Sequence, residues 1–240
     1  MFRRWVVPNG KRRVREPHQL PAGRHGLPRH VVARNQQGRI LAAVADAIAE
    51  KGYGAMNVED VCVRAGVSRR TFYDHYTGKQ GVVLAALDAI AEDLLAEVRA
   101  AFEDAATPIE RVRGCLEAFL GFLARNPAAA SLGVVEVLAA GPEAIELRNR
   151  VMRALAALIQ EGVDEALPRR GAPPALVSET IVGGIYEVAY ARILQGRADQ
   201  LPDLAPDLMY TILLAYGGQE IAAAEHRRAR RRRSRATRDN

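Results

Sequence analysis

The sequence predicts an all-α fold of about nine helices, in which a small amino-terminal unit precedes a larger helical one. Alanine and leucine dominate a composition in which 49% of residues are hydrophobic and only 5% are aromatic. Both are strong helix formers, and the β-branched runs that favour strands are scarce. Apolar residues recur at spacings of three and four from about residue 35 onward, and no strand-like alternation interrupts them.

The first predicted helix covers about residues 35–51. Ile40, Val44 and Ile48 are spaced four residues apart and therefore lie on one face of that helix. Gly52 follows a lysine in the last turn, which is a typical way for a helix to end.

Two short helices are predicted next, with a tight turn between them. Asn57 is a favourable N-cap for the first, and Gly66 is expected to end it by adopting the left-handed conformation. Ser68 then caps a third helix that extends to about Tyr76. Because only Gly66 and Val67 separate this cap from the second helix, the spacing predicts a helix-turn-helix.

The remainder of the chain is predicted to consist of longer amphipathic helices. A fourth helix is expected over residues 79–101. Further helices are expected near residues 109–125, 128–139, 143–167, 174–196 and 203–226. Prolines stand near the beginning of each of these segments, where the first turn of a helix tolerates them.

Positive charge is concentrated at the two ends of a chain whose net charge is +6. Residues 1–34 contain a single acid, Glu16, among many arginines, and residues 227–240 are rich in arginine. We expect a flexible basic arm and a basic tail at these two ends. They are either merely solvated or add sequence-independent attraction for phosphates.

Several classes of protein are excluded by what the sequence lacks. Residues 1–8 lack the apolar core of a signal peptide, and no run approaches the ~18 apolar residues of a membrane-spanning helix. Cys62 and Cys115 lie within apolar helical patterns, which indicates buried thiols in a reducing compartment. The five histidines are scattered, and no metal-ligand spacing or common catalytic motif is present. We therefore expect a cytoplasmic protein that is not an enzyme and that needs no metal or cofactor.

An ordered series of short motifs lies between residues 40 and 83. The series is Gly52-Tyr53, Asn57, Ala65-Gly66-Val67-Ser68, Thr71-Phe72-Tyr73-Asp74-His75-Tyr76 and Lys79. It resembles the amino-terminal domain of the TetR family of transcription regulators. Asn57, Cys62 and Arg70 stand where that family often has threonine, a small residue and glycine, and His75-Tyr76 replaces the common aromatic-Phe ending. We expect Arg70 to change what the third helix reads.

The resemblance implies a DNA-binding helix-turn-helix domain over residues 35–82 and a helical effector-binding and dimerisation domain over residues 83–226. The start of the third helix would then face base edges in the major groove, where arginine pairs with guanine and a threonine can contact a thymine methyl group. We expect Arg70 to read a base and Arg69 to contact a base or a phosphate. The full set of expected DNA contacts is Asn57, Val67, Ser68, Arg69, Arg70, Thr71, Tyr73, His75 and Lys79.

A homodimer on a palindromic operator is also implied, because one helix reads too few base pairs for useful specificity. The expected interface uses the last two helices, in which apolar residues form one stripe each and Gly183-Gly184 permits close approach. These stripes are Val177, Ile181, Ile185, Val188 and Ala189, and Leu204, Leu208, Ile212 and Ala215. The alternative is that the stripes cover the core of their own subunit.

An effector pocket is expected between helices of the second domain, for a small apolar or amphipathic molecule. Its candidate lining residues are Leu116, Phe119, Phe122, Glu136, Met152, Leu155, Ile159 and Tyr186. Glu136 stands in an apolar run, where a carboxylate is costly unless paired. It either pairs with an arginine such as Arg192 or anchors a polar group of the ligand.

Taken together, these features predict a DNA-binding transcription repressor that an effector releases. Two alternatives remain open, because the sequence does not fix the sign of regulation or the role of the arginines. One is an activator of the same fold. The other is a non-specific architectural DNA-binding protein that uses the basic ends of the chain.

Overall fold

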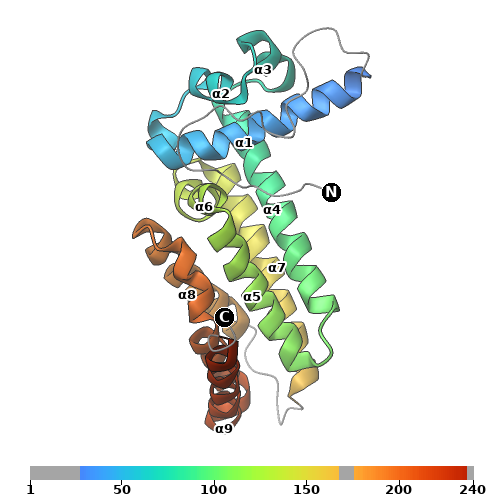
Figure 1. The fold of residues 1–240 in the computed structure, drawn as a ribbon, viewed down its shortest axis with the longest axis vertical. Helices are drawn as coiled ribbons and strands as arrows, with labels where there is room; N and C mark the ends of the chain where they lie inside the picture. The colour runs from blue at the N-terminus through green and yellow to red at the C-terminus, as the bar shows by residue number, and fades with distance from the viewer. Residues whose placement is uncertain (1–27, 168–175, 237–240) are drawn as a thin grey trace.

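The computed structural model describes residues 28–167 and 176–236, and every ordered element among them is helical. The amino-terminal unit contains α1 (Arg29–Ala55), α2 (Val58–Ala65) and α3 (Arg69–His75). These three helices form one end of an elongated molecule, with α1 lying across it (Figure 1). The predicted all-α class and the helix-turn-helix are therefore confirmed.

The larger unit is built around three long helices that run lengthwise beside one another (Figure 1). They are α4 (Lys79–Glu103), α5 (Pro108–Arg125) and α7 (Pro142–Ala166). Pro108 and Pro142 occupy the first helical position of α5 and α7, as predicted. Helices α8 (Leu176–Leu194) and α9 (Ala205–Ala236) lie along one flank of this bundle, and η3 (Ala198–Leu204) connects them. One continuous hydrophobic core extends from Ile40 to Ala222 and so includes both units.

The first helix differs from its prediction at both ends. It begins at Arg29, earlier than the expected residue 35, so that only residues 1–27 of the predicted flexible arm lie outside the described residues. Gly52 does leave the helical conformation, with φ 77°, but a further turn continues to Ala55. The chain is therefore bent at Gly52 rather than ended there.

A single helix over residues 128–139 is not observed, and that prediction was wrong. The segment is divided into α6 (Pro127–Ala130), a π-helical turn η1 (Ser131–Val135) and a 3-10 turn η2 (Glu136–Leu138). Valines 134, 135 and 137 are stiff at χ1 and lower the helix propensity here. The carbonyl of Val134 also accepts a hydrogen bond from the Tyr186 hydroxyl on α8. Tertiary contacts thus shape this segment.

Helix α9 is also not the single straight helix expected over residues 203–226. Gly218 adopts φ 79° and ψ 178°, which reverses the chain. His226 Nε2 lies 2.8 Å from Asp207 Oδ1, although 19 residues of straight helix would span about 28 Å. Residues 205–217 and 219–236 therefore form an antiparallel pair, and most of the predicted basic tail continues the second of these helices.

The stripe predicted for dimerisation on α8 faces the interior of its own subunit. Ile181, Ile185 and Ala189 are buried against the rest of the chain, as Ile212 is on α9. This is the alternative that the sequence left open. No single helix within residues 28–167 and 176–236 is long and apolar enough to cross a membrane, although the bent pair Pro108–Arg125 and Pro127–Leu138 meets that criterion by length and composition.

Candidate nucleic-acid interface and internal cavity

Two N-caps and one helix-ending glycine, all predicted from the sequence, define α2, α3 and the turn between them. Asn57 and Asp60 form a reciprocal capping box at the start of α2, with two hydrogen bonds of 3.0 Å. Gly66 ends α2 in the left-handed conformation, with φ 61°. Ser68 Oγ accepts a hydrogen bond from the Thr71 backbone N–H at 3.0 Å and so caps α3. The direction of α3 is thus fixed by hydrogen bonds within the turn.

One face of α3 is anchored and the opposite face is open. Phe72 is completely buried under α3, and its ring contacts those of Tyr73 and Tyr76. Tyr73, by contrast, is 50% exposed. Among the nine residues expected at DNA, Val67 is half-buried against the core and contributes packing to the turn.

Two arginines at the start of α3 point into solvent. Arg69 lies 3.5 Å from Glu59, but both side chains are largely exposed, and such pairs contribute little to stability. Arg70 is exposed and makes no hydrogen bond or ion pair with the described part of the chain. Its guanidinium is therefore available to a partner molecule.

His75 and Lys79 contact α1 instead of standing free. His75 Nε2 lies 3.5 Å from Gln36 Oε1. The Lys79 ammonium lies 4.4 Å from the centre of the Tyr53 ring and donates a hydrogen bond of 3.1 Å to the carbonyl of Gly54. These contacts fix both side chains beside α3, and the lysine retains further donors.

Glu136 links the larger unit to the end of α1. Its Oε2 accepts a hydrogen bond of 2.8 Å from the backbone N–H of Tyr53, the residue that follows the bend at Gly52. The ion pair with Arg192 that the sequence suggested is not formed, and Glu136 does not line the cavity described next. It joins two parts of the chain that are 83 residues apart, a pairing that no local pattern could have indicated.

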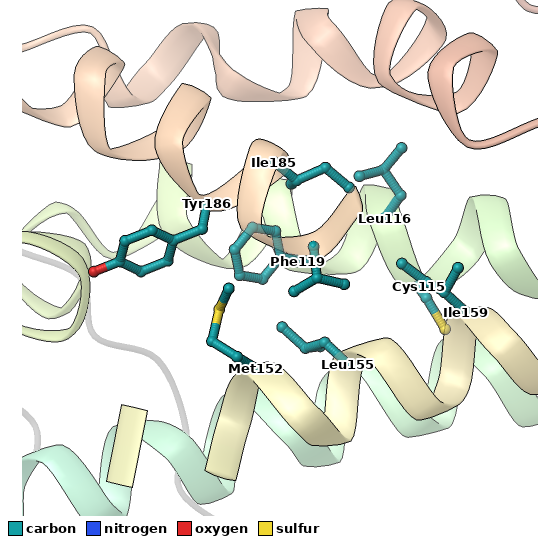
Figure 2. Close-up of a pocket in the computed structure, with 9 residues that line it drawn as sticks. Cys115, Leu116, Phe119, Met152, Leu155, Ile159, Ile185 and Tyr186 are labelled. Carbon is teal, nitrogen blue, oxygen red and sulfur yellow. The ribbon is translucent and has the colours of Figure 1, made fainter. Parts of the chain in front are cut away.

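An apolar cavity with two chambers lies between α4, α5, α7, α8 and η1. The larger chamber encloses about 560 Å³ and the smaller about 370 Å³, each including its mouth. Both share Phe119, Met152, Leu155 and Tyr186, so the chambers adjoin along these residues. Figure 2 shows the smaller chamber, with side chains of α5, α7 and α8 converging on it.

Seven of the eight residues expected at an effector pocket line one or both chambers. They are Leu116, Phe119, Phe122, Met152, Leu155, Ile159 and Tyr186. Arg148 also lines the larger chamber, although no sequence pattern singled it out. Its guanidinium lies 4.0 Å from the centre of the Tyr186 ring. An arginine within an amphipathic helix gives no sign in the sequence that it borders a cavity.

Burial favours the neutral forms of two groups at the cavity, the Tyr186 hydroxyl and the Cys115 thiol. Burial raises the pKa of the Tyr186 hydroxyl above its ordinary value. It raises the pKa of Cys115 to about 12, and the thiol donates to the carbonyl of Val98. Cys62 and Cys115 are both buried free thiols, as predicted. A thiol with so high a pKa is a poor nucleophile, which leaves the cavity suited to binding.

The geometry defines a class of protein, a helix-turn-helix DNA-binding regulator with a hollow helical body. The family of bacterial regulatory proteins called tetR matches residues 40–86. Over these residues the chain is similar to the TetR family of transcription regulators. The match to its family profile covers residues 40–55 of α1, the α2–turn–α3 segment and the beginning of α4.

Curated relatives are similar to the chain in sequence, and a solved structure is similar to it in fold. The activator FasR and the regulator EthR, both of Mycolicibacterium smegmatis, are 28% identical over 109 residues and 24% identical over 184 residues. The FasR match covers 45% of this chain and half of FasR. The EthR match covers 75% of this chain and 82% of EthR. The repressor KstR2 of Mycobacterium tuberculosis is 27% identical over 55% of this chain and 68% of its own. FadR of Bacillus subtilis, solved with stearoyl-CoA, is 18% identical, covers 75% of this chain and 98% of its own, and has a TM-score of 0.64.

Proposed function

We propose that the protein is an operator-binding repressor that a small apolar or amphipathic effector releases from DNA. The single observation that carries this proposal is the pairing of an open, arginine-bearing α3 with an internal apolar cavity in one continuous core. Because α4 lines the cavity and begins at Lys79 beside α3, both sites share one helix. KstR2, a protein similar to this chain, is likewise a transcriptional repressor.

The DNA-reading residues would lie on and around α3. Arg70 is assigned to a base edge, because it is exposed and unpaired within the described chain and arginine can bind guanine O6 and N7 with two hydrogen bonds. Arg69, Thr71 and Tyr73 are assigned to bases or phosphates nearby. Asn57, Val67, Ser68, His75 and Lys79 would hold or extend this surface along the DNA backbone.

A second copy of the chain would provide the second α3 needed to read a palindrome. The outward side of α8 supports this partner, although it is not the stripe that the sequence predicted. No other described atom lies within 4 Å of the position where a side chain at Gly183 or Gly184 would begin. Leu176 and Leu194, near the two ends of α8, are exposed. The helix thus offers a surface that another helix can approach closely.

Release would follow from a shift between two arrangements of the amino-terminal unit. An effector changes operator affinity only if it binds the two arrangements unequally. Two connections can transmit such a preference, α4 itself and the hydrogen bond from Tyr53 to Glu136. Glu136 follows η1, whose Gly133 and Val134 line the larger chamber. A ligand that displaces η1 would therefore act on the bend of α1.

Activation is the second candidate, because FasR is named as an activator. The DNA and effector contacts described above are compatible with activation as well as with repression. Transcription from a promoter that carries the operator, measured with and without the protein, separates the two: lower output supports repression and higher output supports activation.

The experiment that tests DNA reading is selection of bound sequences from a random duplex pool by the full-length protein. We expect a palindrome with two half-sites, retained at moderate salt. Recovery of duplexes without any shared sequence would contradict the proposal and would favour non-specific attraction by the basic ends of the chain.

A further inference from the structure

The larger chamber is bordered by one charged side chain, Arg148, in the described part of the chain. Its Nη1 donates a hydrogen bond of 2.9 Å to Asn149 Oδ1, and its planar head lies over the Tyr186 ring. Its Nε is buried and has no hydrogen-bond partner. None of the described carboxylates pairs with it, although the chain forms ion pairs at many other arginines.

An arginine in this position is costly unless something compensates its charge. A guanidinium stays protonated at any physiological pH, and a charge in an apolar surrounding is stabilised only by pairing and hydrogen bonds. The π face of the Tyr186 ring supplies part of the stabilisation that the guanidinium charge needs. The phenol cannot supply the missing negative charge, because its burial favours the neutral form. The buried Nε of Arg148, which has no hydrogen-bond partner, therefore remains available to an anion.

The rest of the cavity is suited to an apolar body. From the shared wall at Phe119 and Met152, the smaller chamber continues between Leu116, Ile159 and Ile185 (Figure 2). Met152 stands at the junction, and its unbranched side chain adapts to chains of different shape.

We propose that the cavity takes an amphipathic acid, whose single carboxylate pairs with Arg148 while its apolar body fills the adjoining chamber. The flat, two-oxygen carboxylate matches the fork of the guanidinium, which favours it over a neutral hydroxyl of the same chain length. This inference rests on the proposed effector function and names the chemical class of the effector. It assigns to Arg148 the recognition of the acid group.

The test uses decanoate and 1-decanol as matched probes in calorimetric titrations of the full-length protein. The wild type should bind decanoate about tenfold more tightly than decanol, because a hydrogen bond to a charged group is the stronger one. Arg148→Gln should bind both probes equally. Arg150→Gln should keep the preference, because Arg150 is exposed on the same helix and contacts Asp88 instead.

Equal binding of the two probes by the wild type, or a preference that survives in Arg148→Gln, would overturn the proposal. A failure of decanoate to bind at all would also overturn it. If Arg148→Gln does not fold, as judged by its thermal melt, Arg148→Lys serves instead and should show a reduced preference, since lysine lacks the planar fork. Selection of an operator by the same preparations, without any probe, tests the DNA-binding function separately.

Discussion

The DNA-binding helix α3 and the internal cavity are held in place by different kinds of interaction. At α3 the determining interactions are local: Asn57, Gly66 and Ser68 each act on a backbone group within a few residues. At the cavity they are distant: Tyr186 on α8 bonds to Val134 on η1, and Arg148 on α7 lies over the Tyr186 ring. Local chemistry can be recognised in a sequence, whereas a space between helices depends on how every helix around it packs.

The largest expected effect is at the anchor of α3. Phe72→Ala should lower the free energy of unfolding by about 3–5 kcal/mol, because a completely buried aromatic ring leaves a cavity when it is truncated. Urea denaturation followed by circular dichroism measures this. Tyr73→Ala is the matched control, and since its side chain is half exposed it should cost far less stability while it weakens binding to DNA. Equal losses for the two variants would contradict the division of α3 into an anchored and an open face.

The bond between the two units is expected to have the next largest effect. Glu136→Ala should cost about 1–3 kcal/mol, because the partly buried N–H of Tyr53 loses its acceptor. Hydrogen exchange at the Tyr53 amide should become faster, and NMR measures it directly. Glu146→Ala removes an exposed ion pair with Arg153 and should leave that exchange rate unchanged. An unchanged rate in Glu136→Ala would remove this bond from the proposed coupling.

Position 68 separates stability from DNA binding. Ser68→Ala should lower the free energy of unfolding by about 1 kcal/mol, because α3 loses its N-cap. Ser68→Asp restores a capping oxygen and should recover this stability, yet it places a negative charge beside phosphates and should weaken operator binding. Chemical denaturation and operator titration on the same samples measure the two effects. Operator binding by Ser68→Asp at the wild-type level would show that this end of α3 does not approach DNA.

The smallest effect is a pH dependence at the cap of α2. Hydrogen bonds from Lys51 and from the Asn57 N–H lower the pKa of Asp60 below its ordinary 3.8. A carboxylate with a lowered pKa stabilises the fold above its unfolded pKa, and this contribution is lost as the pH falls through the folded value. Unfolding midpoints below about pH 4 should therefore decline less in Asp60→Asn than in the wild type. Parallel declines in the two proteins would rule out this contribution.

Structure that depends on local interactions could be predicted from the sequence, whereas structure that depends on distant contacts could not. The helix-turn-helix was predictable residue by residue, because caps and a left-handed glycine act within one turn. The breaks at residues 131–138 and at Gly218 were not, since contacts with other helices shape the first and the second reverses a continuous apolar pattern. The spacing of apolar residues predicted the stripe of α8. It did not show whether that stripe faces a second subunit or the core of its own subunit.

The candidate site shows the same limit. Seven cavity residues were named from helical spacing, although spacing alone does not separate a cavity wall from a solid core. Glu136 was recognised as a carboxylate in an apolar run, yet its partner is a backbone N–H on the far side of the bend in α1. The buried Nε of Arg148 becomes visible only in three dimensions.

The most direct test of the account is operator titration with Arg70→Ala against every single-base variant of one half-site. We expect a loss of about 1–3 kcal/mol in binding free energy and a relaxed preference at one position per half-site. Arg64→Ala, which removes an arginine of α2 that pairs with Glu50, should leave the preference intact. Uniform weakening by Arg70→Ala across all variants would make Arg70 a phosphate contact, and unchanged binding would contradict the assignment of α3 as the DNA-reading helix.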